Sequence, residues 1–295
     1  MAFAIVSLAM VLVLGSRAHR ARVVRRFDAA YAARFEAGSE GIADGAQPFT
    51  LHAAGTRALL LLHGSGDTPQ TMRYLGERLH RAGFTVHAPL LPGHGRSPSA
   101  FAGADVDASR YLATATAGLD LLRREATWLG VVGLSMGGAL AVQLAADADD
   151  VRALVLLAPY LDPPPMVRWV ARTAWLWGAI APVLDARGEG SVQDEAARTE
   201  SRAYGIVSPP AMRALVRSAE AGRRALGRVT VPALVIHSRE DIRIPTHVAE
   251  RMTASLAGPT ERHWVAGCGH IITVDRCRAE VAGLVLAFLS RVAPG

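Results

Sequence analysis

The chain has 295 residues, of which 51% are hydrophobic and 20% are charged, and it contains no long low-complexity tract. A chain of this length and composition can bury a sizeable core, which excludes an intrinsically disordered protein. Its net charge of +6 is concentrated in one N-terminal segment and the body is nearly neutral, which argues against a nucleic-acid-binding domain with a basic patch on its folded surface.

The N-terminal segment, residues 1–16, is almost purely apolar as far as Gly15. This apolar run is shorter than the roughly 20 residues of a spanning helix, but tilting or local thinning of the bilayer can close the gap. We interpret residues 1–16 as a membrane anchor, with a soluble or wrongly assigned start and a cleavable signal peptide as alternatives. Because arginines follow the anchor, the body is expected on the cytoplasmic face of the membrane, or otherwise in the cytoplasm.

Residues 17–48 are interpreted as a basic amphipathic segment followed by a linker. Residues 1–35 contain one acidic residue, Asp28, and six arginines: Arg17, Arg20, Arg22, Arg25, Arg26 and Arg34. Apolar residues recur every four positions and predict a helical stripe: Val23, Phe27, Tyr31 and Phe35. Such a helix either binds an anionic membrane surface, through residues 1–37, or packs on the domain.

From residue 49 onward, short apolar runs typical of strands alternate with helical patterns. The predicted strands are Ala58–Leu62, Phe84–Ala88, Trp128–Val132, Ala153–Leu157, Ala233–His237 and Arg262–Val265. The predicted helices are Thr71–Ala82, Arg110–Ala126, Met136–Ala146, Thr246–Leu256 and Arg276–Ser290. This alternation predicts an α/β fold with a mostly parallel sheet flanked by helices, formed by residues 49–159 and 229–295.

Residues 160–228 interrupt the alternation, because they contain no strand signal. We interpret them as a helical cap inserted over the sheet, since insertions of this length usually serve function. The cap contains Trp169, Trp175 and Trp177. These side chains are expected either to pack the cap on the core or to line an apolar pocket for an acyl chain.

The two cysteines, Cys268 and Cys277, are too few for a zinc site or a disulfide framework. We predict two free thiols in a reducing compartment. No metal or organic cofactor is expected.

The strongest local motif is Gly133-Leu134-Ser135-Met136-Gly137-Gly138, which matches the G-x-S-x-G turn that exposes a nucleophilic serine between a strand and a helix. Glycines flank Ser135 because the turn is strained and neighbouring backbone comes close. A predicted strand precedes the motif and a helical run follows it. Ser135 is therefore the predicted nucleophile.

A serine hydroxyl needs a general base, and the base needs a carboxylate to orient it. His270 follows the last predicted strand in a glycine-rich loop and is the predicted base. Asp241 follows the strand Ala233–His237 and is the predicted carboxylate, with capping of the next helix as its alternative role. Glu240 and, more remotely, Asp162 are the rival carboxylates.

The oxyanion formed during acyl transfer needs N–H donors. The glycine-rich turn His63-Gly64-Ser65-Gly66 follows a predicted strand, so we assign the donors to the backbone N–H groups of Ser65 and Met136. His63 is interpreted as a structural turn histidine.

Four segments occur in the order typical of the α/β-hydrolase superfamily: LLLLHGSGDTP with GFTVHAPLLPGHGRSP, then GLSMGG, HSREDIRIP and GCGH. Over residues 49–292 the chain most resembles the bacterial carboxylesterases and monoacylglycerol lipases of that superfamily. The resemblance implies that Ser135, Asp241 and His270 match the triad and that Ser65 and Met136 match the oxyanion positions. Many relatives have an aromatic residue where Ser65 stands, which implies a different acyl pocket here.

The predicted function is hydrolysis of a carboxylic ester, with a short or medium acyl chain or a monoacylglycerol, through an acyl-enzyme. Fold alone does not fix function, so two alternatives stay open. One is another triad-dependent hydrolase that cleaves an amide, a peptide or a carbon–carbon bond. The other is a catalytically silent receptor that uses the same pocket.

Overall fold

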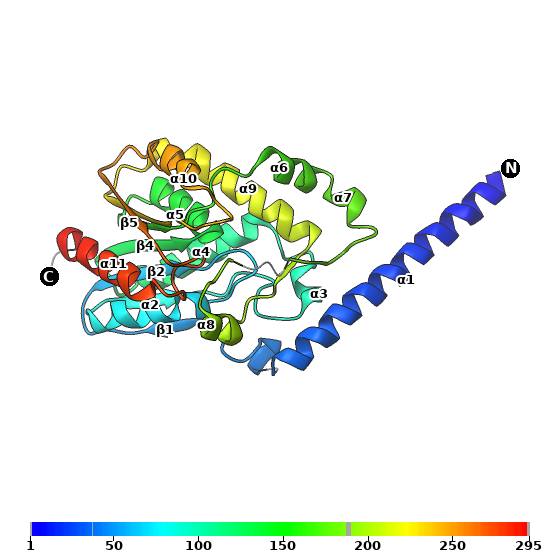
Figure 1. Ribbon diagram of the computed structural model, residues 1–295, viewed down its shortest axis with the longest axis horizontal. Helices are drawn as coiled ribbons and strands as arrows, with labels where there is room; N and C mark the ends of the chain where they lie inside the picture. Colours follow the sequence, from blue (N-terminus) through cyan, green and yellow to red (C-terminus); the bar gives the residue numbers. More distant parts are fainter. Residues whose placement is uncertain (1, 37, 187–189, 294–295) are drawn as a thin grey trace.

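The computed structural model describes residues 2–36, 38–186 and 190–293, and a seven-stranded sheet runs through the centre of that described part (Figure 1). The spatial order is β1-β3-β2-β4-β5-β8-β9, and only β1 is antiparallel to its neighbour. The strands are β1 (Phe49–Leu51), β2 (Arg57–Leu62), β3 (Thr85–Ala88), β4 (Trp128–Leu134), β5 (Val151–Leu157), β8 (Ala233–Ser238) and β9 (Thr260–Val265). The predicted fold class is confirmed. The three-residue edge strand β1 was not among the predicted strands.

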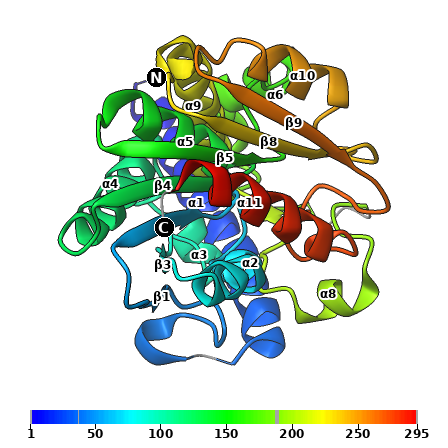
Figure 2. The ribbon, with the colours of Figure 1, turned by 90° about the vertical axis from the view of Figure 1, so that its left-hand side faces the viewer.

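Helices cover both faces of the sheet, which explains why β2 is a run of leucines (Figure 2). Leu60 and Leu62 pack in the cluster that contains α4 (Ala108–Arg123), α5 (Met136–Asp147) and α9 (Pro209–Ala225). Leu59 and Leu61 pack with α2 (Gln70–Arg81) and α11 (Arg278–Val292). Alternate residues of a strand point to opposite faces, so a strand buried on both faces is continuously apolar.

The strand order reverses direction at β2. The chain passes from β2 to β3 on one side, and then returns to β4 on the other side of β2. At such a switch point the loops that follow the two diverging strands leave a crevice at the carboxyl edge of the sheet, where ligands bind in open α/β folds. The glycine-rich turn after β2 and Ser135 after β4 both lie at this edge.

The segment 160–228 contains α6 (Pro165–Arg172), α7 (Ala174–Trp177), α8 (Glu195–Glu200), α9 and the 3-10 helix η2 (Leu226–Arg228). It also contains a short antiparallel pair, β6 (Leu184–Asp185) and β7 (Ile206–Val207). The expectation of no strand in this segment was wrong, because two residues per strand are too few to produce a period-two pattern. Helix α9 packs closely on α5, because a Cβ at Gly222 would lie 2.7 Å from the carbonyl oxygen of Ala139.

The N-terminal region forms one helix, α1 (Ala2–Arg34), whose first half projects beyond the body in Figure 1. The second half packs on the domain. Phe27 and Tyr31 pack against the core, and Phe35 is buried in a separate small cluster with Ile42. For Phe27, Tyr31 and Phe35 of the predicted stripe, the interpretation that it packs on the domain is confirmed. Within the part of the chain that the structure describes, no helix is both long and apolar enough to cross a membrane.

Three shorter elements complete the chain, namely η1 (Ser39–Gly41), α3 (Pro98–Phe101) and α10 (Thr246–Thr253). Helix α3 lies beside α1, and the Ser99 N–H donates a hydrogen bond to the Asp28 carboxylate (2.9 Å).

The prediction of two free thiols was wrong, because Cys268 and Cys277 form a disulfide. The chain turns back between β9 and α11, which brings the two Cα atoms to 5.8 Å, a separation that a disulfide spans readily. Spacing along the sequence does not reveal this reversal. A disulfide is typical of an oxidising compartment. Here it closes the loop that carries His270.

Candidate active site

Ser135 occupies a strained turn between β4 and α5, with φ +52° and ψ −115°. Two neighbouring glycines leave no room for a side chain. A Cβ at Gly133 would lie 2.3 Å from the Gly137 carbonyl oxygen, and one at Gly137 would lie 2.2 Å from the Leu62 carbonyl oxygen. The Ser135 N–H donates to Leu157 of the adjacent β5 (2.9 Å). The surrounding backbone therefore holds Ser135 in a conformation that an isolated turn would avoid.

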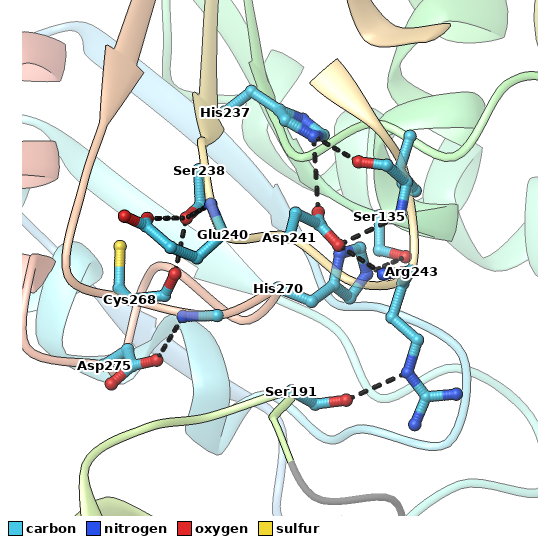
Figure 3. Close-up of polar contacts among 12 residues, drawn as sticks. Ser135, Ser191, His237, Ser238, Glu240, Asp241, Arg243, Cys268, His270 and Asp275 are labelled. Carbon is cyan, nitrogen blue, oxygen red and sulfur yellow. Dashed lines mark hydrogen bonds and ion pairs between the residues drawn. The ribbon is translucent and has the colours of Figure 1, made fainter. Parts of the chain in front are cut away.

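Ser135, His270 and Asp241 come from three separate loops and form one hydrogen-bonded chain (Figure 3). His270 Nδ1 lies 2.7 Å from Asp241 Oδ2, and His270 Nε2 lies 2.9 Å from Ser135 Oγ. Since a carboxylate only accepts, Nδ1 carries the proton and donates it to Asp241. The unprotonated Nε2 then accepts from the Ser135 hydroxyl, which is the arrangement a general base requires.

The Asp241 carboxylate is buried, and both of its oxygens accept hydrogen bonds. Its second oxygen, Oδ1, accepts from the backbone N–H groups of Arg243 (2.7 Å) and Ile244 (3.0 Å). Burial alone would raise the pKa of Asp241, but the hydrogen bond and charge of His270 and the Ile244 N–H outweigh it, so the pKa is lowered. A carboxylate that stays ionised holds the imidazole in one tautomer.

His237 supports Asp241 as a neutral side chain. Its Nε2 donates to the Ile244 carbonyl oxygen (2.8 Å) and lies 3.4 Å from Asp241 Oδ2. The short distance to Asp241 suggests an ion pair, but burial lowers the pKa of His237 despite that carboxylate. We therefore treat the contact as close packing of a neutral ring, since Nε2–H is already committed to Ile244.

The turn after β2 carries Ser65, one of the two residues whose N–H groups are assigned to the oxyanion. The Gly66 N–H is occupied, because it donates to His94 Nε2 (3.0 Å). Within the described residues, no acceptor receives the N–H of Ser65 or of Met136. These two N–H groups therefore remain available to a ligand.

Two buried histidines fix this turn. His63 Nε2 accepts from the Leu91 N–H (3.1 Å), and burial lowers the pKa of His63 well below its usual value. Burial likewise lowers the pKa of His94, to about 4. Both rings are therefore neutral, in agreement with the interpretation of His63 as a structural histidine.

Asp67 ends the same turn and is a buried titratable group near Ser135 that was not among the predicted site residues. It is 6% exposed. A Cβ at Gly64 would lie 2.8 Å from Asp67 Oδ2 and 3.3 Å from Ser135 Cβ, so the two side chains are close. Burial raises the pKa of Asp67 to about 6, although the charges of His270 and Arg243 oppose the rise.

We expect Asp67→Asn to stabilise the protein increasingly as pH rises. The ordinary pKa of 3.8 is raised to about 6 in the fold. Between these values the folded state binds more protons than the unfolded state, so the free energy of unfolding of the wild type falls as pH rises. Above pH 6 the wild type carries the full cost of ionising the buried Asp67. That cost is about 3 kcal/mol. Urea unfolding of both proteins between about pH 4 and pH 7.5 measures it.

Asp107→Asn is the opposite-sign control for this measurement, because a hydrogen bond from Ser109 lowers the pKa of Asp107. The Asp107 variant should lose stability relative to wild type as pH rises. A stability difference for Asp67→Asn that does not change with pH would contradict the argument.

The three cap tryptophans differ in exposure. Trp169 is 62% exposed and Trp175 is 72% exposed. Trp177 is half-buried, and its indole N–H donates to the Val170 carbonyl oxygen (2.9 Å). Trp169 and Trp175 therefore form neither a packed contact with the core nor the wall of an enclosed pocket.

Within the described ranges, no three His, Cys, Asp or Glu side chains are grouped so as to hold a metal ion. Four residues around the site were not predicted as functional from the sequence: Asp67, His94, His237 and Asp275. His94 lies in the Pro-Gly-His-Gly part of the segment GFTVHAPLLPGHGRSP, which contributed only to the family resemblance. Asp67 and Asp275 carry no local signal beyond their short distance, along the chain, from Gly64 and His270.

A family model described as serine aminopeptidase, S33, matches residues 54–276. The thermostable monoacylglycerol lipase of Bacillus sp. (strain H-257) is 27% identical over 255 residues, a match that covers 85% of this chain and 96% of that protein. The carboxylesterase of Bacillus subtilis (strain 168) is 23% identical over 248 residues, covering 83% and 97%. A chain from the structural work on LipS and LipT, two metagenome-derived lipolytic enzymes, superposes with a TM-score of 0.77 at 29% identity, covering 85% and 99%.

Proposed function

Because the chain belongs to the serine aminopeptidase S33 family and has the α/β-hydrolase fold, we propose that it cleaves carboxylic esters through an acyl-enzyme formed on Ser135. Its monoacylglycerol lipase and carboxylesterase relatives support an ester-cleaving serine hydrolase. One observation carries the assignment of residues: the continuous hydrogen-bonded chain from Asp241 through His270 to the Ser135 hydroxyl.

In the proposed reaction, His270 Nε2 removes the Ser135 proton as Oγ attacks the ester carbonyl carbon. Asp241 stabilises the resulting imidazolium. The carbonyl oxygen becomes an oxyanion that accepts from the N–H groups of Ser65 and Met136. His270 then protonates the leaving alcohol, and in the second half of the reaction it deprotonates the water that releases the acid.

We propose an uncharged ester as substrate, with a short or medium acyl chain or a monoacylglycerol. Two relatives that match 85% and 83% of this chain support this class, because they are named as a monoacylglycerol lipase and a carboxylesterase. The family description also names an aminopeptidase, so an amide or peptide substrate is the alternative to separate by experiment.

A serine-reactive fluorophosphonate tests the assignment of Ser135. The purified wild-type protein should be labelled, Ser135→Ala should not, and p-nitrophenyl esters of graded acyl length should be hydrolysed faster than amino-acid p-nitroanilides. Labelling that persists in Ser135→Ala would remove that residue from its role. Faster cleavage of the anilides would replace the ester by an amide.

We infer further that the protein docks on an anionic membrane surface. An exposed apolar surface lies on and just after α6 and α7, and we call it the cap face. It consists of Met166, Trp169, Trp175, Leu176 and Ile180, each at least 52% exposed. Exposed apolar groups that cluster in this way mark interaction sites, and tryptophan is favoured at lipid interfaces.

The arginines of α1 lie close to the cap face. His19 of α1 contacts the Ile180 carbonyl oxygen (2.8 Å), which sets the basic half of the helix beside this surface. The exposed arginines there are Arg17, Arg20, Arg22, Arg25 and Arg26. Each arginine close to an anionic leaflet contributes about 1 kcal/mol. Apolar contact and charge would therefore act on the same membrane.

Vesicle sedimentation tests the docking. The full chain should bind phosphatidylglycerol vesicles, bind phosphatidylcholine vesicles much less, and lose binding in high salt. The double variant Trp169→Ser with Trp175→Ser should bind about 10-fold more weakly, because it removes two interfacial anchors. Leu121→Ser, at an exposed leucine of α4, is the control. Equal binding by wild type and the double variant would exclude the cap face.

A further inference from the structure

Asp275 is a buried carboxylate that takes no part in the triad, yet it binds the loop that carries the triad histidine. It is 0% exposed and lies between β9 and α11. Its Oδ2 accepts from the Gly269 N–H (2.7 Å), which is the amide directly before His270. Figure 3 shows this contact beside the triad.

The same carboxylate also binds the insertion as it returns to the core. Asp275 accepts from the N–H groups of Gln193 and Asp194, both at 2.8 Å. A fourth bond, from the Arg276 N–H (2.8 Å), closes its own turn. Each oxygen therefore receives two N–H donors, which compensates for the burial of this carboxyl group.

Residues 190–194, which we call the strap, lie directly on the histidine loop. The Ile271 N–H donates to the Ser191 carbonyl oxygen (2.9 Å). Gly269 leaves no space between the two segments, because a Cβ there would lie 2.2 Å from the Gly190 carbonyl oxygen. The strap thus contacts Gly269 and Ile271, the two residues that flank His270, and Asp275 hydrogen-bonds to both segments.

The disulfide encloses both His270 and Asp275, because Cys268 and Cys277 close the loop from 268 to 277. The covalent bond fixes only the ends of this loop. Asp275 adds an internal contact, because it binds the amide next to His270 from within the same loop.

We propose that Asp275 is a positioning residue, which clamps the strap to the histidine loop and thereby holds the His270 ring in reach of Ser135. The proposal rests on the proposed function, because it concerns the same triad. The ring must keep two hydrogen bonds at once, to Asp241 and to Ser135, so a small displacement of its backbone breaks one of them. Misplacement of a reacting group by about 1 Å costs roughly 100-fold in rate.

Asp275→Asn is the direct test, because it keeps the shape of the side chain but turns an amide NH₂ toward N–H donors. We expect kcat for p-nitrophenyl butyrate to fall about 10- to 100-fold, with KM changed less than about threefold. The rate of inactivation by a small fluorophosphonate should fall in parallel, since this probe reports on Ser135 and His270 and has little contact with the insertion. Asp107→Asn, the same change at a surface helix cap, should keep wild-type kinetics.

Three outcomes would overturn the proposal. A folded Asp275→Asn protein with a lowered melting temperature but wild-type kcat and labelling rate would make Asp275 purely structural. A raised KM with an unchanged labelling rate would restrict Asp275 to the insertion. If Asp275→Asn does not fold, Gly269→Ala replaces it, because its Cβ separates strap and loop, and unchanged kcat there would refute the clamp. A wild-type protein that neither hydrolyses the ester nor reacts with the probe would instead refute the proposed function.

Discussion

Asp241→Asn is expected to lower kcat about 10,000-fold while leaving the protein folded. In the variant, the side-chain oxygen keeps the N–H groups of Arg243 and Ile244, so the new NH₂ faces His270 Nδ1. Nδ1 must then accept, and the ring proton moves to Nε2. A protonated Nε2 cannot accept the Ser135 proton, and loss of the correct tautomer in another serine hydrolase has this magnitude.

Steady-state hydrolysis of p-nitrophenyl butyrate measures the loss, and circular dichroism checks that the variant is folded. Glu240→Gln is the matched control, because Glu240 is the neighbouring carboxylate and, among the described residues, hydrogen-bonds only with Ser238. Asp162→Asn is the second control, since Asp162 pairs with Arg168, Arg223 and Arg251. If either control variant loses activity as severely as Asp241→Asn, the assignment of the orienting carboxylate is wrong.

Local patterns were sufficient to predict the turn around Ser135, because the motif that defines it spans only six residues. Gly133 and Gly137 are required by backbone atoms of α5 and of β2 that a Cβ would strike. The continuous apolar runs of β2, β4 and β8 likewise follow from burial on both faces. For Gly133 and for the strands, the physical cause acts between neighbours in sequence or equally along a whole strand. For Gly137 the contacting atoms belong to the distant β2, but the motif itself marks the position.

Contacts between distant segments could not be predicted in the same way. Asp275 binds amides 81 and 82 residues earlier, and its sequence surroundings resemble an ordinary helix start. The disulfide depends on a chain reversal that spacing does not encode. The apolar stripe of α1 was compatible with a membrane or with the domain, and only the packing of Phe27, Tyr31 and Phe35 decided between them.

The vesicle experiment also tests which residues of α1 contact a membrane. The apolar stripe packs on the domain, so any membrane contact of α1 must come from other residues of the helix. The exposed arginines and the neighbouring cap face fit that requirement. The proposed membrane contact thus differs from the one the sequence pattern indicated, although it involves the same helix.

Gly137→Ala is expected to destabilise the fold by more than about 4 kcal/mol, which is exceptional for a single methyl group. Alanine normally favours a helix over glycine by about 1 kcal/mol. Here the added Cβ would lie 2.2 Å from the Leu62 carbonyl oxygen and 2.7 Å from that of His63. Leu62 belongs to β2, a strand paired on both sides, so the backbone cannot move aside without breaking the sheet.

Gly283→Ala is the matched control, because Gly283 lies inside α11 and a Cβ there would have no atom within 4 Å. This control should be neutral or stabilising by up to about 1 kcal/mol. Urea unfolding of both variants compares the two glycines directly. Similar stability of the two variants would mean that β2 and α5 separate at little cost, and the strained turn at Ser135 would then lack the rigid support that its conformation requires.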